Sequence, residues 1–159
     1  EAKTNEEWQA AGEKGQPAWC YYDNDPKNGE KYGKLYNWYA IKDPRGIAPK
    51  GYHVPSKEEW DILESYLGGE EIAGKKLKST EGWLEVGNGT NESGFSGLPG
   101  GFRYYYGYFY TVGNNAGWWS STELDTYYAC KLELNDNNDD VSRDATKGGF
   151  GFYVRCLRD

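Results

Sequence analysis

The apolar residues of this chain stand in short stretches separated by glycine and polar residues, and this spacing limits the folds it can adopt. Glycine occurs 22 times, and the large apolar side chains are mainly aromatic: 7 Trp, 15 Tyr and 5 Phe. Short apolar stretches between glycines are typical of turns and short strands rather than of a helical bundle. Because Trp and Phe bury much area per residue, we expect them to form the core, with Tyr at the surface.

The length and charge narrow the class of protein. At 159 residues the chain is predicted to form a single domain, residues 1–159. The net charge of -7 disfavours phosphate backbones, so we expect no nucleic acid partner. No stretch approaches the roughly 18 apolar residues of a membrane span, so we expect no membrane insertion by this domain. No signal peptide stands at its N-terminus, so any export signal or anchor is expected to lie outside this chain.

Two helices are predicted. The clearer one follows Pro55, where Ser56 and Glu59 have the spacing of a capping box. Trp60, Leu63 and Leu67 then recur on one helical face, and 68–69 is a Gly-Gly stop. A shorter helix is predicted from the capping box at 4–7 to about residue 12.

The remainder is predicted to form turns and short strands. Residues 23–29 indicate a turn, and 96–103 indicate a turn that enters a strand. The strand candidates are 19–22, 104–110, 118–122, 129–134 and 150–157, together with 35–41, which fits either a buried strand or a helical turn. Helices followed by a loop-rich antiparallel sheet give an α+β fold.

The sequence argues against catalysis. His53 is the only histidine, and its place just before a capped helix favours a structural role. No phosphate-binding loop or nucleophile elbow is present, so we predict that the chain is not an enzyme. Cys20 and Cys156 fit equally well two small buried side chains or a disulfide, whereas Cys130 is predicted to be unpaired.

The polar run 135–140 (NDNNDD) admits two interpretations. Clustered Asn and Asp oxygens can bind calcium, and the candidate ligands are Asn135, Asp136, Asn138 and Asp139. The run lacks the spacing of an EF-hand loop, and Asn and Asp are also the ordinary residues of a hairpin loop. We favour the hairpin loop, and therefore predict no cofactor and no metal, with calcium as the alternative.

The run Tyr104–Tyr110 contains five tyrosines. In a strand, alternation places every second side chain on the outer face, so at least two of these rings are expected to be exposed. Tyrosine offers a large rigid contact area, and neighbouring Asn, Ser and Gly add adaptable hydrogen bonds. This composition is typical of a surface that binds another molecule.

Several motifs resemble the Fibrobacter succinogenes major paralogous domain family, and they span nearly the whole chain. They are Trp19–Tyr22, Tyr32–Ala40, Gly51–Ser56 with Glu59–Trp60, Asn91–Ser96, Leu98–Arg103, Trp118–Thr122, and Gly151–Phe152 with Val154–Cys156. The resemblance implies a C-type-lectin-like fold, with two short helices packed on a small twisted antiparallel sheet with long loops. It also implies a secreted or surface-anchored bacterial protein.

Some relatives with this fold look like the variable proteins of diversity-generating retroelements, in which Asn or Tyr codons near the C-terminus are altered. By that resemblance, Trp118, Trp119, Ala129, Leu134, Val141, Arg143, Gly151, Phe152 and Val154 match the framework. The expected function is an extracellular binding or adhesion module whose partner is a protein or glycan on another cell or surface. The expected contact residues are Tyr104, Tyr105, Tyr106, Tyr108, Tyr110, Asp125, Tyr127, Tyr128, Lys131, Glu133, Asn135, Asn137, Asp140, Ser142, Asp144, Thr146 and Phe150, and Cys130 is another position that looks free.

The resemblance also brings two alternatives and one departure. Leu134–Asp136 is similar to the Trp-Asn-Asp element of calcium-dependent lectins, which suggests a calcium-dependent carbohydrate-binding module, although the companion Glu-Pro-Asn loop is absent. Formylglycine-generating enzymes share the fold, but neither Cys20 nor Cys156 matches their reactive cysteines. Gly148 and Gly149 replace longer polar residues of the family, so we expect a bare loop there.

Overall fold

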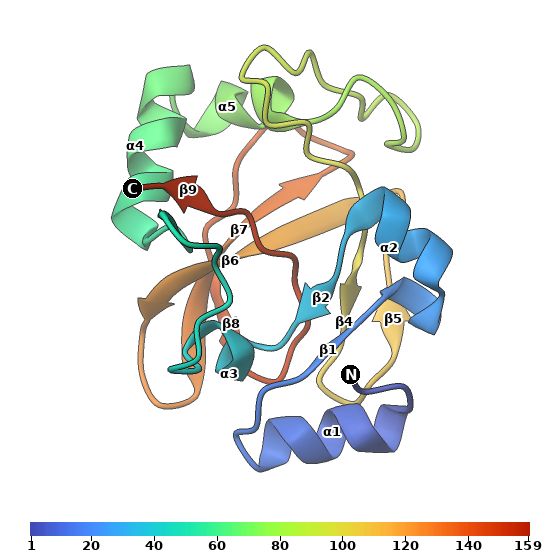
Figure 1. Cartoon of the computed structure of the whole chain (residues 1–159). Helices are drawn as coiled ribbons and strands as arrows, with labels where there is room; N and C mark the ends of the chain where they lie inside the picture. Colours follow the sequence, from blue (N-terminus) through green and yellow to red (C-terminus); the bar gives the residue numbers. More distant parts are fainter.

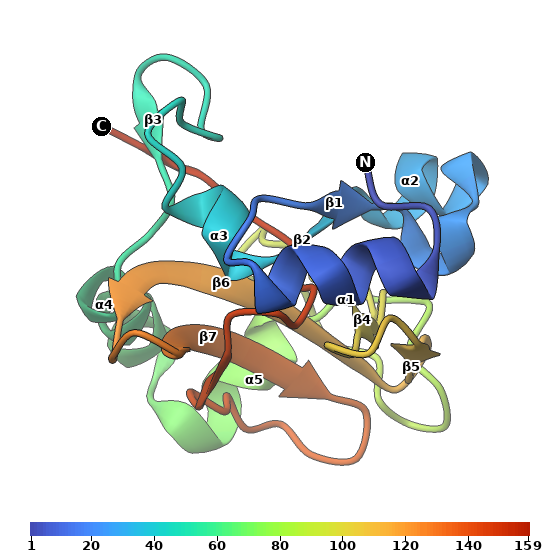
Figure 2. The same cartoon turned by 90° about the horizontal axis from the view of Figure 1, so that it is seen from below.

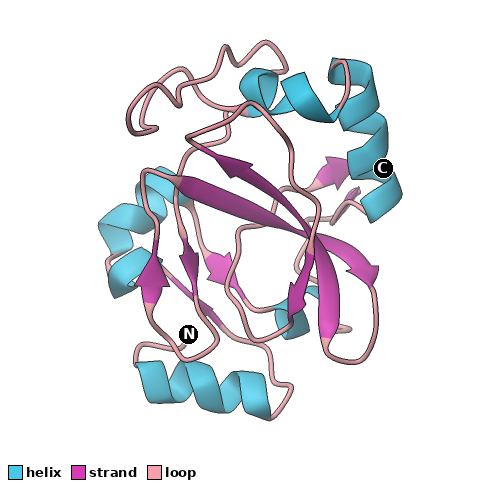
Figure 3. Cartoon of the chain, turned by 180° about the vertical axis from the view of Figure 1, so that it is seen from behind, coloured by secondary structure: helices cyan, strands magenta, loops and turns pink.

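The computed structural model describes all residues, 1–159, and is a mixed α+β structure with helices at its periphery (Figures 1 and 3). The helices are α1 (Asn5–Glu13), α2 (Pro26–Tyr32), α3 (Trp38–Ile41), α4 (Lys57–Leu67) and α5 (Glu70–Leu77), with a 3₁₀ turn at Tyr22–Asn24. The strands are β1 (Trp19–Cys20), β2 (Leu35–Tyr36), β3 (Tyr52–His53), β4 (Phe102–Arg103), β5 (Phe109–Tyr110), β6 (Asn115–Glu123), β7 (Tyr128–Asn135), β8 (Ala145–Lys147) and β9 (Leu157–Arg158).

The centre of the fold is the antiparallel sheet β6-β7-β8. The long strands β6 and β7 cross the middle of the molecule, with α4 and α5 at one end and α1 at the opposite end (Figure 1). Three two-stranded sheets surround it, pairing β1 with β2, β3 with β9 and β4 with β5. Seen from below, α1 runs across the β1 and β4 side of the molecule (Figure 2).

Both predicted helices are present with the predicted caps. The hydroxyls of Thr4 and Ser56 accept hydrogen bonds from the N3 amides of α1 and α4, and the N3 glutamates complete both capping boxes. Trp60 and Leu67 are buried, and α4 ends at Gly68 in the left-handed conformation, with φ of 110°. None of the helices has the length and apolar character that crossing a bilayer requires.

The prediction of only two helices is wrong. α2 replaces part of the expected turn at 23–29, because Asp25 caps the backbone amide of Lys27 and Pro26 stands at the first helical position. α5 begins directly after Gly69, with acidic residues in its first turn and lysines in its last, which suits the helix dipole. The segment 35–41 forms β2 and then α3, so both of its interpretations apply in succession.

Two predicted strands are also wrong. The run Tyr104–Tyr110 is a hairpin turn in which only 109–110 is strand, since the Tyr104 amide bonds to the Tyr108 carbonyl at 2.7 Å. Residues 150–157 do not follow one ladder: Gly151, Phe152 and Tyr153 each bridge to a different neighbour, and only β9 is strand. β8, which the sequence pattern did not reveal, occupies the edge of the central sheet.

The core is built largely from tryptophan, as expected. Trp8, Trp60, Trp83 and Trp118 belong to the main buried cluster, and Trp119 joins Trp38, Ala129 and Phe152 in a second one. Most tyrosines are at least partly exposed, but Tyr22 and Tyr153 are buried. The hydroxyl of Tyr153 donates a 2.7 Å hydrogen bond to the carbonyl of Gly100, which satisfies its polar end.

All three cysteines are free thiols. Cys20 is buried, and burial raises its pKa to about 11. Cys156 and Cys130 are partly buried, and burial raises the pKa of each. The disulfide alternative is therefore not realised, and Cys20 is a small buried core residue.

Candidate ligand-binding site

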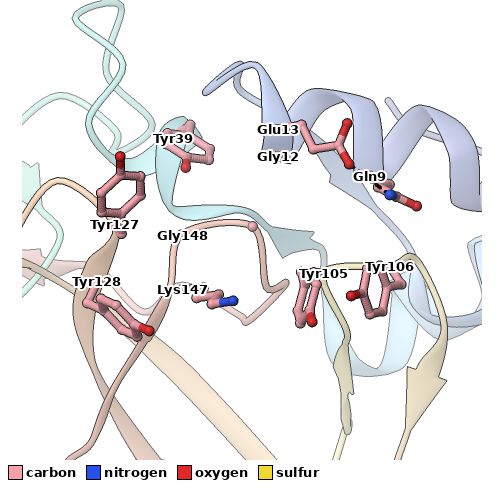
Figure 4. A pocket seen from close by; sticks show the side chains of 11 residues that line it. Gln9, Gly12, Glu13, Tyr39, Tyr105, Tyr106, Tyr127, Tyr128, Lys147 and Gly148 are labelled. Carbon is pink, nitrogen blue, oxygen red and sulfur yellow. Dashed lines mark hydrogen bonds between the residues drawn. The ribbon is translucent and has the colours of Figure 1, made fainter.

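A pocket of about 520 Å³ lies where five segments far apart in the sequence meet (Figure 4). This volume is within the roughly 300–1,000 Å³ range of small-molecule sites. Its apolar lining consists of tyrosines alone. We call it the tyrosine pocket, and its lining is Gln9, Gly12, Glu13, Tyr39, Tyr105, Tyr106, Tyr127, Tyr128, Lys147, Gly148 and Gly149.

One wall of the pocket comes from the β4–β5 turn. The ring centroids of Tyr105 and Tyr106 are 4.0 Å apart, and the Tyr104 ring lies 4.5 Å from Tyr105 and 5.8 Å from Tyr106. Phe150 packs behind them, 4.7 Å from Tyr104. Hydrogen bonding to Tyr106, with burial as a second cause, raises the pKa of Tyr105, so its phenol stays protonated at neutral pH.

A buried arginine fixes this turn. Arg103 is fully buried, and its guanidinium donates to the carbonyls of Gly107, Ala2 and Thr4 at 2.8–2.9 Å. The guanidinium carbon is 4.7 Å from the Trp8 ring centroid. Gly107 has φ of 98°, and a Cβ there would lie 2.5 Å from the Cα of Asn5. The turn is therefore held directly against the start of α1.

The opposite wall comes from the β6–β7 hairpin. The Asp125 carboxylate accepts hydrogen bonds from the amides of Tyr127 and Tyr128, at 2.7 and 2.9 Å. Tyr127 is 71% exposed, and Tyr128 is 38% exposed. Figure 4 shows these two rings facing Tyr105 and Tyr106 across the pocket. Asp125 therefore shapes the loop that presents the tyrosines.

The floor of the pocket is glycine backbone. The carbonyls of Gly148 and Gly149 accept hydrogen bonds from the Trp38 amide and from the Trp8 indole, both at 2.9 Å. A Cβ on Gly12 would lie 3.3 Å from the Cα of Gly149, so α1 and this loop approach closely. Both loop glycines are buried, and the bare loop expected at 148–149 forms the base of a cavity.

Charged groups flank the pocket on two sides. Lys147 lies between the tyrosine walls, with its Nζ 4.9 Å from the Tyr105 ring centroid (Figure 4), and it forms no ion pair. Glu13, on α1, accepts a 2.8 Å hydrogen bond from the Gln9 side chain. The pocket thus combines a free ammonium, an amide and a carboxylate with aromatic walls.

A second, more polar depression of about 460 Å³ lies at the other end of β7. We call it the polar groove, and its lining is Glu70, Asn135, Asn138, Asp140, Val141, Ser142, Arg143 and Asp144. Arg143 is held there by ion pairs with Asp61 and, at 3.0 Å, with Glu64. These pairs join the loop to α4.

The loop 135–140, for which calcium binding is the alternative interpretation, already surrounds a cation of the protein itself. Lys78 is 1% exposed, and its Nζ donates to the carbonyls of Asn138 at 2.7 Å and Asn135 at 3.2 Å, with an Asp139 carboxylate oxygen at 3.4 Å. The Asp136 carboxylate accepts from the side chain of Asn114. No group of three or more His, Cys, Asp or Glu side chains is arranged to hold a metal ion.

The predicted contact residues do not form one surface in the structure, because some line the tyrosine pocket, some line the polar groove and others lie outside both. Tyr105, Tyr106, Tyr127 and Tyr128 line the tyrosine pocket, and Asn135, Asp140, Ser142 and Asp144 line the polar groove. Exposed but outside both are Tyr108, Tyr110 and Asn137, and partly buried outside both are Thr146, Cys130 and Tyr104. Exposure of Tyr106, Tyr108 and Tyr110 confirms that at least two rings of the run are exposed.

The prediction that Lys131 is a free surface position is wrong. Its side chain is 7% exposed, pairs with Glu133 and lies 5.5 Å from the Phe152 ring centroid. Glu133 is largely buried and also accepts a 2.8 Å hydrogen bond from Asn115. Phe150 supports the tyrosine wall from behind. Lys131 and Glu133 therefore join β7 to its neighbours in the fold, whereas Phe150 supports the β4–β5 turn.

Sequence reasoning missed Gln9, Glu13, Tyr39 and Lys147. Gln9 and Glu13 are one helical turn apart on α1, a spacing that places them on one face, but nothing in the local pattern connects that face to the C-terminal third. The glycine pair at 148–149 was the one available signal.

A family model for the Fibrobacter succinogenes major domain matches residues 2–158. The chain belongs to this family. Comparison with curated proteins and with solved structures gives no match. The resemblance inferred from the scattered motifs is thereby confirmed, and in this member of the Fibrobacter succinogenes major domain family one motif residue, Tyr39, lines the tyrosine pocket.

Proposed function

We propose that this domain is a non-catalytic binding module that holds its ligand in the tyrosine pocket. The observation that supports it is the convergence of five tyrosines from separate segments, Tyr39, Tyr105, Tyr106, Tyr127 and Tyr128, on one concave site. Concave aromatic sites with a few polar groups are the usual form of ligand pockets. Tyrosine adds rigid contact area at low entropic cost, which favours recognition.

The lining favours binding over catalysis. No histidine or cysteine lines the pocket, and the raised pKa of Tyr105 keeps that phenol neutral rather than available as a base. The Glu13 carboxylate is engaged by the Gln9 amide. His53, the only histidine, lies between Glu59 and Asp159, away from this lining.

We propose further that the fold is C-type-lectin-like and that the domain acts outside the cell or on a bacterial surface. Support for the fold comes from the C-terminal segment, which returns to pair with earlier parts of the chain: Phe152 bridges to Tyr36, and β9 pairs with β3. The ligand would then be a protein or glycan on another cell or surface. Sequence changes of the kind that diversity-generating retroelements introduce could alter ligand binding at Tyr127 and Tyr128, because these residues line the pocket.

The proposal is tested by measuring whether ligand binding is lost when one tyrosine from each wall of the pocket is replaced by alanine. Labelled wild-type protein, the double variant Tyr105→Ala/Tyr127→Ala, and the control Tyr66→Ala would be applied to arrayed glycans and peptides. Tyr66 is 85% exposed on α4 and lies outside the pocket. We expect Tyr66→Ala to bind as wild type does and the double variant to lose binding. Equal binding by the double variant and wild type would exclude this pocket as the ligand site.

A further inference from the structure

We propose that the ligand of the tyrosine pocket is a saccharide that carries a carboxylate, such as a uronic acid unit, with the carboxylate at Lys147. This inference rests on the proposed function, since it names the chemical class that the same pocket would hold. Three observations lead to it: the form of the walls, the distribution of polar groups, and the unpaired charge of Lys147.

The walls fit a pyranose ring. The rings of Tyr127 and Tyr128 lie across the pocket from Tyr105 and Tyr106 (Figure 4), so a saccharide in the pocket has aromatic side chains available on two sides. The C–H faces of a pyranose stack on such surfaces. The glycine floor, Gly148 and Gly149, adds no side chain that would block a flat ligand.

The lining contains no aliphatic side chains, and this favours a saccharide ligand over a protein ligand that would insert an apolar side chain. Every apolar lining residue is a tyrosine, and each therefore carries a hydroxyl group. An apolar protein side chain leaves such hydroxyls without partners on burial, which costs free energy. A saccharide can supply hydroxyls as partners for them, and the Gln9 amide and Glu13 carboxylate can bind further hydroxyls.

The charge distribution selects an acidic sugar. Lys147 projects between the walls with no carboxylate of the protein paired to it, and its nearest ring is that of Tyr105. Glu13 lies on the α1 side of the pocket, where Figure 4 shows it apart from the Lys147 ammonium. A ligand carboxylate at Lys147 gains a charge-assisted hydrogen bond, and the ring hydroxyls then face Glu13.

The test compares acidic oligosaccharides with their neutral counterparts. Short oligomers of galacturonate, glucuronate and mannuronate, and the methyl ester of each, would be titrated into wild type and into Lys147→Gln, Lys147→Arg, Lys50→Gln and Tyr105→Ala/Tyr127→Ala. Lys50 is exposed and forms no ion pair, so Lys50→Gln removes the same charge elsewhere.

We expect at least one acid to bind wild type and Lys50→Gln about tenfold more tightly than its ester, in keeping with a charge-assisted hydrogen bond. Lys147→Gln should remove that preference, and Lys147→Arg should keep it. Equal binding of acid and ester by wild type, an unchanged preference in Lys147→Gln, or binding of none of the three acids would overturn the inference. Binding that survives in the double tyrosine variant would instead count against the pocket itself, and so against the proposed function.

Discussion

The indole Nε1 of Trp8 donates a buried 2.9 Å hydrogen bond to the carbonyl of Gly149, which lies 141 positions later in the chain. This bond joins α1 to the glycine floor of the tyrosine pocket. The same indole ring lies 4.7 Å from the guanidinium carbon of Arg103, which fixes the turn that presents Tyr105 and Tyr106. Trp8 therefore couples the N-terminal helix to both the floor and one wall of the pocket.

Replacement of Trp8 by phenylalanine should destabilise the protein. The change leaves the Gly149 carbonyl buried without a donor, which costs about 1–3 kcal/mol in the free energy of unfolding. Urea unfolding of Trp8→Phe would measure the loss. Trp19→Phe is the matched control, because the Trp19 side chain is partly exposed and contacts Lys34 and Tyr21 near the surface, and it should cost less. An effect of Trp8→Phe no larger than that of the control would contradict the anchoring role.

Alanine substitutions along the β7 region should separate structural from contact residues. Lys131→Ala leaves the largely buried Glu133 carboxylate without its cation, so we expect a loss of about 1–3 kcal/mol. Tyr127→Ala removes a largely exposed ring and should stay within about 0.5 kcal/mol of wild type. Thermal and urea unfolding of both variants would check this difference, and equal stability of the two would refute the assignment of Lys131 to the framework.

The sequence predicted those parts of the fold that depend on local chemistry. The capping boxes at Thr4 and Ser56 and the glycine stop at Gly68 are complete within a few residues, so α1 and α4 could be recognised directly. α5 was missed because its N-cap, Gly69, makes no side-chain hydrogen bond. The Tyr104–Tyr110 run is a turn because Arg103 and Gly107 bind it to α1, a long-range contact that no local pattern reveals.

Only part of the candidate site could be predicted from the sequence, because long-range contacts that no local pattern reveals bring the rest of it together. Tyr105 and Tyr127 could be proposed from composition, since clustered tyrosines are unusual in a small core. Gln9 and Glu13 reach the pocket because long-range contacts, such as the bond from Trp8 to Gly149, hold α1 beside it. Lys131 was wrongly predicted to be an exposed contact residue. The alternation of side chains along β7 could not show that Lys131 is buried against Glu133 and Phe152.

Lys78 should determine both the stability of the 135–140 loop and its response to calcium. Lys78→Met leaves two partly buried carbonyls without their donor, so we expect a loss of about 1–3 kcal/mol by urea unfolding. Lys75→Met is the control, because Lys75 is half exposed and pairs with Asp139 at 3.4 Å. Calcium should not shift the wild-type melting temperature, since the ammonium already occupies the loop. A calcium-dependent rise that is lost in Asp139→Asn would favour the calcium-dependent alternative.

The cysteines should differ in their reactivity toward thiol reagents. Cys20 is buried with its pKa raised to about 11, so almost none of it is thiolate near neutral pH. In native protein we expect Cys130 and Cys156 to be labelled slowly and Cys20 only as the protein unfolds. Mass spectrometry of native and denatured samples would identify the sites. Labelling of Cys20 in native protein as fast as that of Cys130 would contradict its burial.

His53 should give the protein a stability that depends on pH near neutrality. Its Nδ1 is 2.7 Å from an Asp159 carboxylate oxygen and its Nε2 is 2.8 Å from one of Glu59, and hydrogen bonding to Asp159, then to Glu59, raises the pKa of the imidazole. A raised pKa in the folded state means that the stabilisation is complete below the unfolded pKa of about 6.5 and disappears as the pH rises through the folded value. The melting temperature of wild type should therefore fall across this range, whereas that of His53→Gln should not. Because His53 is the only histidine, few other groups titrate there. Parallel pH profiles for wild type and His53→Gln would show that the bridge between β3, α4 and the chain end contributes nothing to stability.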